Sequence, residues 1–394
     1  MISFWTPVHN PEVQQWYQKK AAPAFEAKYG VKVKFRFLDF SNYVDAILVA
    51  VAAGTGPDTY LVSAETMPFW ADKGLARPLD AYVKTWAQQR DIIAGAWKAG
   101  QWKGAQTGIP YTVHAKTILY RKDVFAQCGL VSSRGPDTWE ELKTCALKTT
   151  RWSENKVTRL GMPVPGSQDY SVMVWSYGGE VLSADLRTAK FNSREGIEAL
   201  RLRVETNDLQ VPRGKELSLG GDFPNTIATG KLVMGWCAPN HVSTMLRTAP
   251  QEEQNLGVGY PPKAKERVTE IHTTKLAIST QTKRPDLAWK WVSFLMEPAN
   301  LRVFCDALER FPARKSLADS RFIINSRLMP RFMDIMNDFG RPWIETPTDF
   351  VRLQAIMDEG LLKAINHKKS PEEALSELAA TFDRELQRGR SGRK

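Results

Sequence analysis

The chain has 394 residues, of which 43% are hydrophobic and 25% charged, and its formal net charge at pH 7 is +11. This length is long for a single hydrophobic core and predicts two lobes, while the composition is typical of a soluble globular protein. No apolar run reaches the roughly 18 residues that a membrane-spanning helix needs, so the sequence predicts no transmembrane helix.

The positive charge does not by itself indicate a nucleic-acid partner. Part of it lies in the Gly/Ser-containing residues 387–394, which we expect to form a flexible basic tail. Elsewhere basic and acidic residues alternate, as in residues 195–205, and no basic stripe is interleaved with aromatic residues. This pattern favours a solvated surface over a nucleic-acid site, which would bind with strong salt dependence.

Strand and helix patterns alternate at the start of the chain. Short β-type runs are predicted at residues 2–7, at residues 31–35 and after Asp58, and the helical runs between them end at Gly30 and Gly54. The order strand, helix, strand, helix, strand predicts an α/β fold with a parallel sheet. Ligand sites in such sheets lie beyond the carboxyl ends of the strands. In this chain those ends are residues 6–10, 39–43 and 63–66.

Helix-capping signals mark elements further along the chain. Thr138 and Glu141 form a capping box at the start of one predicted helix, and another helix is predicted to begin near Asn192. The last helix is predicted from Ser370 as its cap and Pro371 in its first position. An apolar stripe follows these two residues and consists of Leu375, Leu378, Phe382 and Leu386.

The middle of the chain contains β-leaning segments. Residues 111–119 are extended in pattern and suit a connection between lobes, and residues 256–279 indicate strands joined by turns. An amphipathic helix is predicted over residues 285–295.

Short fragments are spread through the chain in a definite order. They are Phe25-Glu26 with Tyr29-Gly30, Ala53-Gly54 with Gly56-Pro57-Asp58, Gly74-Leu75 with Pro78-Leu79-Asp80, Gly108-Ile109-Pro110-Tyr111, Leu119-Tyr120-Arg121-Lys122-Asp123, Thr138-Trp139-Glu140-Glu141-Leu142 and Tyr177-Gly178-Gly179-Glu180. Their order and residue identities resemble those of the extracellular solute-binding proteins of sugar ABC importers, family 1, the maltose-binding-protein-like group. The resemblance runs to about Leu386.

This resemblance implies an α/β, two-lobed, periplasmic-binding-protein-like fold of type II, with the ligand cleft between lobes that a multi-strand hinge joins. The implied first lobe is residues 1–111 plus 276–312, and the second is residues 112–275 plus 313–386. The chain would cross between the lobes three times, which suits rigid-body closure around a ligand.

The function implied by the resemblance is a solute-binding receptor that captures a saccharide and delivers it to membrane permease subunits. The expected ligand is an oligosaccharide, and an acidic sugar is one option. We expect a monomer without turnover, cofactor, metal or nucleic-acid partner. We expect a periplasmic or extracellular location, membrane-anchored if the protein is lipidated, with Met1 replacing a removed export signal. The alternatives are the same fold binding a glycerol phosphate ester or a polyamine, and a carbohydrate-active enzyme.

Sequence signatures of enzymes give little support to the last alternative. Gly-x-Ser-x-Gly, Gly-x-Gly-x-x-Gly, a phosphate loop ending in Gly-Lys-Ser/Thr and His-Glu-x-x-His are all absent from the sequence. A pair of carboxylates at catalytic separation would be needed instead, and the sequence singles out none.

The aromatic content, 13 Trp, 10 Tyr and 17 Phe, suits carbohydrate binding, because sugars stack on flat rings and pair their hydroxyls with polar side chains. Candidates in the first lobe lie on strand ends or on the first crossing. They are Trp5, Thr6, His9, Asn10, Tyr43, Glu65, Trp70, Tyr111 and His114. Trp70 suits either the core or a cleft wall. By resemblance, Glu65 takes the place of a ligand-contacting acid, while Thr66 replaces the basic residue of maltose-binding relatives.

Candidates in the second lobe rest mainly on the resemblance. Gln168, Asp169 and Tyr170 match a ligand loop of the family, and residues 234–241 match the strand and loop that bring an aromatic side chain to the site. The candidates in that segment and in the C-terminal part are Trp236, Asn240, His241, Trp343 and Arg352. Trp236 suits the core equally well.

Histidines and cysteines leave alternatives open. His9, His114 and His241 either converge on an anionic or hydroxyl-rich ligand or hold separate structural positions. A zinc site is disfavoured because no pair is spaced as ligands on one helical turn. Cys128 and Cys145 either form a disulfide or are separate thiols.

Overall fold

The computed structural model describes residues 1–394 except 9, 40–41, 63–65, 164–165, 213–215, 218–222, 343–345, 347, 349 and 392–394. The chain divides into two compact units, which are described separately. Unit 1 is Met1–His114, His272–Asn325 and Glu345–Pro347, and unit 2 is Ala115–Ile271, Ser326–Ile344 and Thr348–Lys394.

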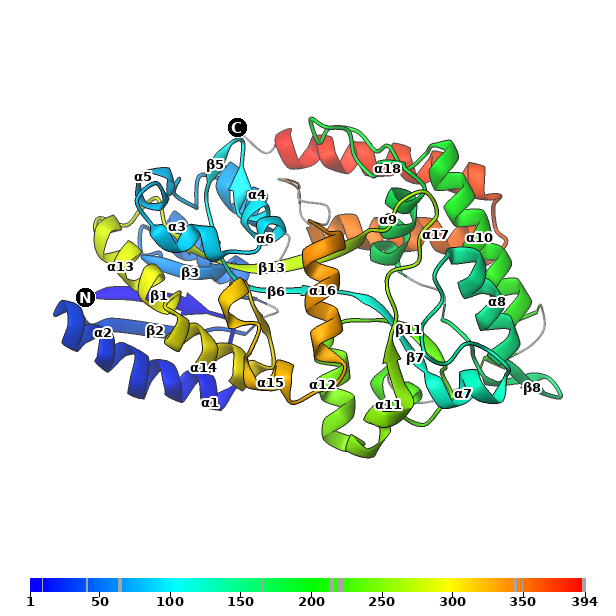
Figure 1. Ribbon diagram of the computed structural model, residues 1–394. Helices are drawn as coiled ribbons and strands as arrows, with labels where there is room; N and C mark the ends of the chain where they lie inside the picture. The colour runs from blue at the N-terminus through cyan, green and yellow to red at the C-terminus, as the bar shows by residue number, and fades with distance from the viewer. Residues whose placement is uncertain are drawn as a thin grey trace. The chain divides into compact units, whose positions relative to one another are not determined.

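Unit 1 contains a mixed β-sheet with helices packed on it (Figure 1). Its strands in sheet order are β14 (Phe311–Pro312), β6 (Ile109–Ala115), β13 (Thr269–Ile278), β3 (Thr59–Val62), β1 (Ile2–Thr6) and β2 (Val33–Phe37). β1 pairs in parallel with both β2 and β3, whereas β13 runs antiparallel to β3 and places Leu276 opposite Leu61. The parallel strands at the start of the chain are those that the alternating pattern predicts.

Short helices connect these strands. They are α1 (Pro11–Trp16), the π-helix η1 (Tyr17–Ala21), α2 (Ala22–Tyr29), α3 (Tyr43–Ala52), α4 (Met67–Asp72), α5 (Asp80–Val83), η3 (Ala87–Asp91), α6 (Ala94–Ala99), α13 (Pro285–Leu295), α14 (Pro298–Leu308), η5 (Lys315–Leu317) and α15 (Arg321–Ile324), with the hairpin β4 (Gln101–Trp102) and β5 (Ala105–Gln106) between α6 and β6.

The end of α2 shows why its sequence fragment has a fixed form. Gly30 follows the helix with φ of +67°, a left-handed conformation that favours glycine, and its N–H donates to the carbonyl of Glu26 at 2.7 Å. Phe25 is buried against Trp291 and Phe294 of α13, with ring centroids 5.1 and 5.4 Å away. The fragment therefore ends a helix and packs it on the core.

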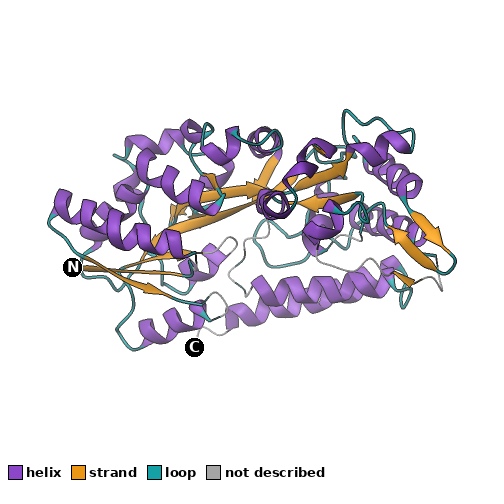
Figure 2. Cartoon of the chain, turned by 90° about the horizontal axis from the view of Figure 1, so that it is seen from below, coloured by secondary structure: helices purple, strands orange, loops and turns teal. Residues whose placement is uncertain are grey.

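Unit 2 contains a small antiparallel sheet enclosed by longer helices (Figures 1 and 2). The sheet consists of β11 (Met234–Cys237), β7 (Thr117–Arg121) and β12 (Leu256–Val258). Its helices are α7 (Lys122–Gln127), α8 (Trp139–Thr149), α9 (Ser167–Ser176), α10 (Arg194–Gln210), α11 (Phe223–Ala228), α12 (Pro239–Thr248), η4 (Pro250–Asn255), α16 (Met329–Phe339), α17 (Phe350–Ile365) and α18 (Pro371–Ser391).

Two further strand groups belong to unit 2. β8 (Arg151–Ser153), β9 (Lys156–Arg159) and β10 (Glu216–Leu217) form a second sheet. β15 (Gly340–Pro342) pairs in parallel with residues 269–271, the first part of β13. The long helices α17 and α18 lie side by side (Figure 1).

Capping explains where the helices of unit 2 begin. The side chain of Ser370 accepts from the backbone N–H of Glu373 at 3.2 Å, and the carboxylate of Glu373 accepts from the N–H of Ser370 at 3.0 Å. This confirms the capping box predicted for α18. Thr138 caps α8 through the N–H of Glu141 at 3.1 Å, although the Glu141 carboxylate accepts from Asp137 instead of from Thr138.

Two boundaries can be compared with those expected from the sequence. The helix expected near Asn192 begins at Arg194, because Ser193 is its cap and accepts from the N–H of Gly196 at 3.2 Å. Residues 313–325, which the sequence placed in the second lobe, belong to unit 1. There the carbonyl of Ala313 accepts from Ile93 at 2.9 Å, and Arg314 forms an ion pair with Asp91 at 2.7 Å.

The cysteines are free thiols, so Cys128 and Cys145 do not form the disulfide that the sequence left open. Cys145, Cys237 and Cys305 are buried, and Cys128 is partly exposed. Among the described residues, no helix is both long and apolar enough to cross a membrane.

Candidate functional site

The candidates at the end of β1 lie in or beside the core of unit 1. Thr6 is fully buried, and its hydroxyl has no hydrogen-bond partner in the described part of the chain. Trp5 is buried, with the guanidinium carbon of Arg36 4.5 Å from its ring centroid. Asn10 caps α1, because its side-chain oxygen accepts from the N–H of Val13 at 3.1 Å. His9 lies outside the described residues.

Tyr43 and Trp70 belong to one hydrophobic cluster of unit 1. The Tyr43 hydroxyl donates to the carbonyl of Leu61 at 2.9 Å, and the Trp70 indole N–H donates to the hydroxyl of Thr66 at 3.1 Å. Trp70, for which the sequence allowed either core or cleft wall, is therefore a core residue with its polar atom satisfied. Glu65 lies outside the described residues, so its proposed ligand contact stays a prediction.

β6 holds the two candidates on the first crossing of the chain. Tyr111 is fully buried and packs on Phe304, with ring centroids 4.3 Å apart. Burial raises the pKa of the Tyr111 phenol well above its usual value. His114 is partly exposed and stacks on His272 of β13, at a centroid distance of 5.0 Å and an interplanar angle of 18°.

In unit 2, Asn240 and His241 lie in the first turn of α12 and are partly exposed. The Nδ1 atom of His241 accepts from the N–H of Ala238 at 3.4 Å, which gives this histidine a capping role. The described residues contain no cluster of histidine, cysteine and carboxylate side chains suited to a metal ion. Convergence of His9, His114 and His241 on one ligand stays a prediction.

Arg352 lies on α17, and its Nε is 3.9 Å from a carboxylate oxygen of Glu385 on α18. It lines a groove of about 500 Å³ between these two helices, together with Lys363 and Glu377, which form an ion pair at 2.7 Å. Trp343 lies outside the described residues.

The strongest concentration of polar side chains in unit 2 surrounds the start of α9. Tyr170 is fully buried and donates to the carbonyl of Gly196 at 3.0 Å, which gives it a packing role. Asp169 is 8% exposed and accepts from the N–H of Gly166 at 3.1 Å. Gln168, which directly precedes these two residues, is partly exposed and accepts a hydrogen bond from the ammonium group of Lys116.

Lys116 connects Gln168 to a buried carboxylate on β13. Its Nζ lies 3.8 Å from Oε1 of Glu270, whose side chain is 0% exposed, against 19% for Lys116. The same Glu270 oxygen accepts from the indole N–H of Trp236 at 3.2 Å. Trp236 stacks on Trp139, at a centroid distance of 6.0 Å. We call the set of Lys116, Gln168, Asp169, Arg203, Trp236 and Glu270 the polar cluster.

Electrostatics within the polar cluster follow from burial. Burial raises the pKa of the Asp169 carboxyl to about 7; Lys116 and Arg203 oppose this shift, and Glu270 adds to it. Burial also lowers the pKa of the Arg203 guanidinium to about 10, which the carboxylates of Asp169 and Asp358 oppose. Arg203 lies over the ring of Tyr170, 5.6 Å from its centroid.

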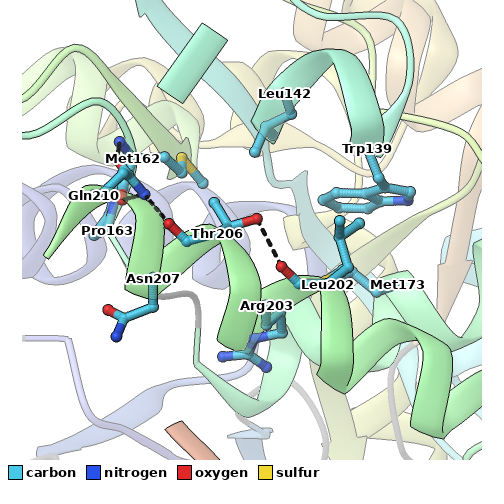
Figure 3. Close-up of a pocket in the computed structure, with 10 residues that line it drawn as sticks. All are labelled: Trp139, Leu142, Met162, Pro163, Met173, Leu202, Arg203, Thr206, Asn207 and Gln210. Atoms are coloured by element: carbon cyan, nitrogen blue, oxygen red, sulfur yellow. Dashed lines mark hydrogen bonds between the residues drawn. The ribbon is translucent and has the colours of Figure 1, made fainter. Parts of the chain in front are cut away.

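A pocket that shares Arg203 with the polar cluster lies next to α8 and α10 (Figure 3). Its lining is Trp139, Leu142, Met162, Pro163, Met173, Leu202, Arg203, Thr206, Asn207 and Gln210. Most of these side chains are apolar. Gln210 accepts from the N–H of Met162 at 2.8 Å and donates to the carbonyls of Met162 and Thr206, both at 3.1 Å. Its amide is therefore already used, and the lining suits packing more than binding a hydroxyl-rich ligand.

The polar cluster contains three of the predicted residues, Gln168, Asp169 and Trp236, and three that sequence reasoning missed, Lys116, Arg203 and Glu270. Lys116 lies within residues 111–119, the extended segment predicted for the first crossing, which was the available signal. Glu270 lies in a strand with one other charged residue, Lys275, and Arg203 lies in a helix with many. Nothing in the sequence shows that either of the two is buried. Chemically, the cluster offers fixed donors and acceptors beside aromatic rings, which is a binding arrangement.

The architecture of the two units is that of the periplasmic-binding-protein fold. The structure of the sugar-binding protein MalE from Xanthomonas citri matches with a TM-score of 0.86 at 20% identity, covering 99% of this chain and 98% of that one. The predicted α/β fold class is thus confirmed. The sequence profile described as "Bacterial extracellular solute-binding protein" matches residues 10–301, and the chain belongs to this family.

Relatives of similar length support the same assignment. A binding protein of Brucella abortus is 24% identical over 326 residues, 82% of this chain and 78% of that protein. The galactooligosaccharide-binding protein of Bacillus subtilis is 23% identical over 390 residues, 95% of this chain and 88% of its own length. Family membership confirms the expectation of a binding receptor that does not turn over its ligand.

Proposed function

We propose that this protein is the saccharide-binding component of an ABC importer, capturing an oligosaccharide and delivering it to membrane permease subunits. Membership of the solute-binding family supports this, as do relatives named for a galactooligosaccharide and for a sugar. The observation that carries the proposal is the polar cluster, because sugar hydroxyls need donors and acceptors that are held in place beside aromatic rings.

Gln168 is the side chain best placed to recognise a ligand hydroxyl by hydrogen bonding. It is partly exposed, and Lys116 already fixes the orientation of its amide by donating to the carbonyl oxygen. The amide nitrogen then has donors for a ligand oxygen, because an amide carries two N–H bonds. A bound saccharide that lacks the matching hydroxyl would cover this amide without satisfying its hydrogen bonds, which is how such sites discriminate between ligands.

We further propose that ligand binding changes the arrangement of the two units. A ligand that binds one arrangement more tightly shifts the population towards it, whatever the order of events. The expected signature is a smaller radius of gyration in solution scattering at ligand saturation. An unchanged scattering profile at saturation would argue against this part of the proposal.

The family also supports a location outside the cytoplasm, which we propose to be periplasmic or extracellular, with a lipid anchor as one means of retention. Fractionation of cells that produce the native gene product tests this directly. Recovery with the cytoplasmic fraction would overturn it.

The experiment that tests the ligand class is a thermal-shift screen of neutral oligosaccharides, uronic oligosaccharides, glycerol phosphate esters and polyamines. A ligand at 100 times its dissociation constant adds about 2.7 kcal/mol to the stability of the folded state, which gives a clear shift. A shift by a saccharide that is recovered uncleaved supports the proposal. A shift only by a glycerol phosphate ester or a polyamine would reassign the ligand, and cleavage products would indicate an enzyme.

A further inference from the structure

The charged side chains of the polar cluster differ in their access to solvent. The side chain of Lys116 is 19% exposed, whereas that of Glu270 is 0% exposed, and Asp169 and Arg203 are both buried. A ligand that reaches the cluster would therefore meet the Lys116 ammonium before any of the other charges.

The ammonium of Lys116 has donor capacity left for such a ligand. It carries three N–H bonds, and Gln168 accepts one of them. The oxygen of Glu270 is 3.8 Å from the nitrogen, which is an ion-pair distance and too long for a hydrogen bond. Further hydrogen bonds from Lys116 can thus go to an oxygen of the ligand.

The charge of Lys116 is already balanced inside the protein. The carboxylate of Glu270 lies at ion-pair distance from it, and the same oxygen also accepts from the uncharged indole N–H of Trp236. Arg203 has its own carboxylates in Asp169 and Asp358, which oppose the lowering of its pKa. A ligand carboxylate placed on Lys116 would be desolvated beside the buried Glu270, and like charges at such a site repel each other strongly.

We infer that Lys116 donates a hydrogen bond to a hydroxyl of a neutral saccharide, and that Glu270 beneath it disfavours saccharides carrying a carboxylate at that position. This inference rests on the proposed function. It narrows the ligand class to neutral saccharides, whereas the sequence allowed both neutral and acidic sugars. Burial of Asp169 favours its protonated form, so its ionisation at higher pH adds a second negative charge against an acidic ligand.

The test compares matched ligands that differ only in the oxidation of C6. Cellobiose and cellobiouronic acid differ by one hydroxymethyl group replaced by a carboxylate, and in α-1,4-galactobiose and α-1,4-digalacturonic acid both hydroxymethyl groups are replaced. Calorimetric titration at pH 7.5 of the intact chain is expected to give binding to a neutral member and at least about tenfold weaker binding to its acidic counterpart.

Substitutions of Lys116 and Glu270 test whether these two side chains cause the preference for neutral over acidic saccharides. Lys116→Gln is expected to weaken binding of the neutral ligand by about tenfold to a hundredfold, the range for a hydrogen bond from a charged donor. Glu270→Gln keeps an acceptor for Trp236 but leaves Lys116 unbalanced, so it is expected to shift the preference towards the acidic member. Lys143→Gln is the matched control, because Lys143 is equally exposed at 19% and forms ion pairs with Glu140 and Glu205.

A second variant covers the case in which Lys116→Gln does not fold because the buried Glu270 loses the ammonium of Lys116. The double variant Lys116→Gln/Glu270→Gln restores neutrality and is expected to fold but to bind weakly. Full affinity in the double variant, or in a folded Lys116→Gln, would overturn the inference. Tighter binding of an acidic member to the parent protein would also overturn it while leaving the proposed function intact. Binding of no saccharide in any pair or screen would overturn both.

Discussion

The carboxylate of Asp58 accepts two hydrogen bonds from Ser3, one from its backbone N–H at 2.7 Å and one from its hydroxyl at 3.0 Å. The Ser3 hydroxyl in turn accepts from the backbone N–H of Asp58 at 2.9 Å. Because Ser3 lies in β1 and Asp58 directly precedes β3, this reciprocal pair holds the ends of two neighbouring strands together.

Replacing Asp58 by alanine is expected to lower the free energy of unfolding by about 2 kcal/mol or more, since several donors lose a charged acceptor. Asp58→Asn keeps an acceptor oxygen and is expected to cost less. Urea unfolding followed by circular dichroism measures both. Equal stability of the alanine variant and the parent would show that the pair contributes nothing.

The stability of the protein is expected to depend on the titration of Asp169. Burial raises the pKa of this carboxyl in the folded state from 3.8 to about 7. Between these values the folded state holds a proton that the unfolded state has lost, so the free energy of unfolding falls as pH rises from about 4 to about 7. The variant Asp169→Asn is expected to lack this pH-dependent decrease. The free energy of unfolding of the variant, relative to that of the parent protein, should therefore increase as pH rises.

Urea titrations at several pH values check this prediction, and Asp319→Asn provides a control of opposite sign. The Asp319 carboxyl has a lowered pKa because Arg302 donates to it at 2.7 Å, so its contribution to stability is lost as pH falls. Identical pH profiles for the parent and Asp169→Asn would contradict the assignment.

Loss of the cap of α18 should weaken the packing of the C-terminal helices. Ser370→Ala removes the acceptor for the N–H of Glu373 and is expected to lower the free energy of unfolding by about 1 kcal/mol. Ser370→Asp keeps an acceptor at the same place and should behave like the parent. Thermal unfolding midpoints distinguish the two variants, and an unchanged midpoint for Ser370→Ala would rule out the capping contribution.

Cys128 is expected to react with thiol reagents faster than the other cysteines. Cys128 is partly exposed, whereas Cys145, Cys237 and Cys305 are buried, and burial raises the pKa of the Cys145 thiol to about 11. A thiol reagent such as Ellman's reagent should label Cys128 quickly in the native protein and the other three only after unfolding. Rapid native labelling of all four would contradict these burial assignments, and Cys128→Ser identifies the fast site.

Local signals in the sequence predicted those parts of the fold that depend on near neighbours. Two of the family-like fragments proved to contain a helix end at Gly30 and a cap at Thr138, where the partner lies within a few residues. Ser370, which was predicted as a cap from its own surroundings, is similar. Such positions are constrained by backbone geometry, which a sequence pattern records.

The candidate site was harder to predict because burial of a polar residue depends on distant partners. β13 lies within residues 256–279, which the sequence predicts as strands joined by turns, but Glu270, His272 and Lys275 break any apolar pattern in it. All three are nonetheless buried, because β13 lies between β6 and β3. The aromatic candidates Tyr43, Trp70, Tyr111 and Tyr170 are buried in the cores of their units, and their ligand contacts stay predictions.

β13 also sets a constraint on the order in which the chain can complete its structure during synthesis. Its partner β3 ends at Val62, but the residue that pairs with Leu61 is Leu276, more than 200 positions later. Until the ribosome has released that segment, one edge of β3 presents unpaired backbone groups, and unpaired strand edges are sites of aggregation. Unit 1 therefore cannot be completed cotranslationally before most of unit 2 has emerged, and no single cut in the gene yields either unit as one continuous piece.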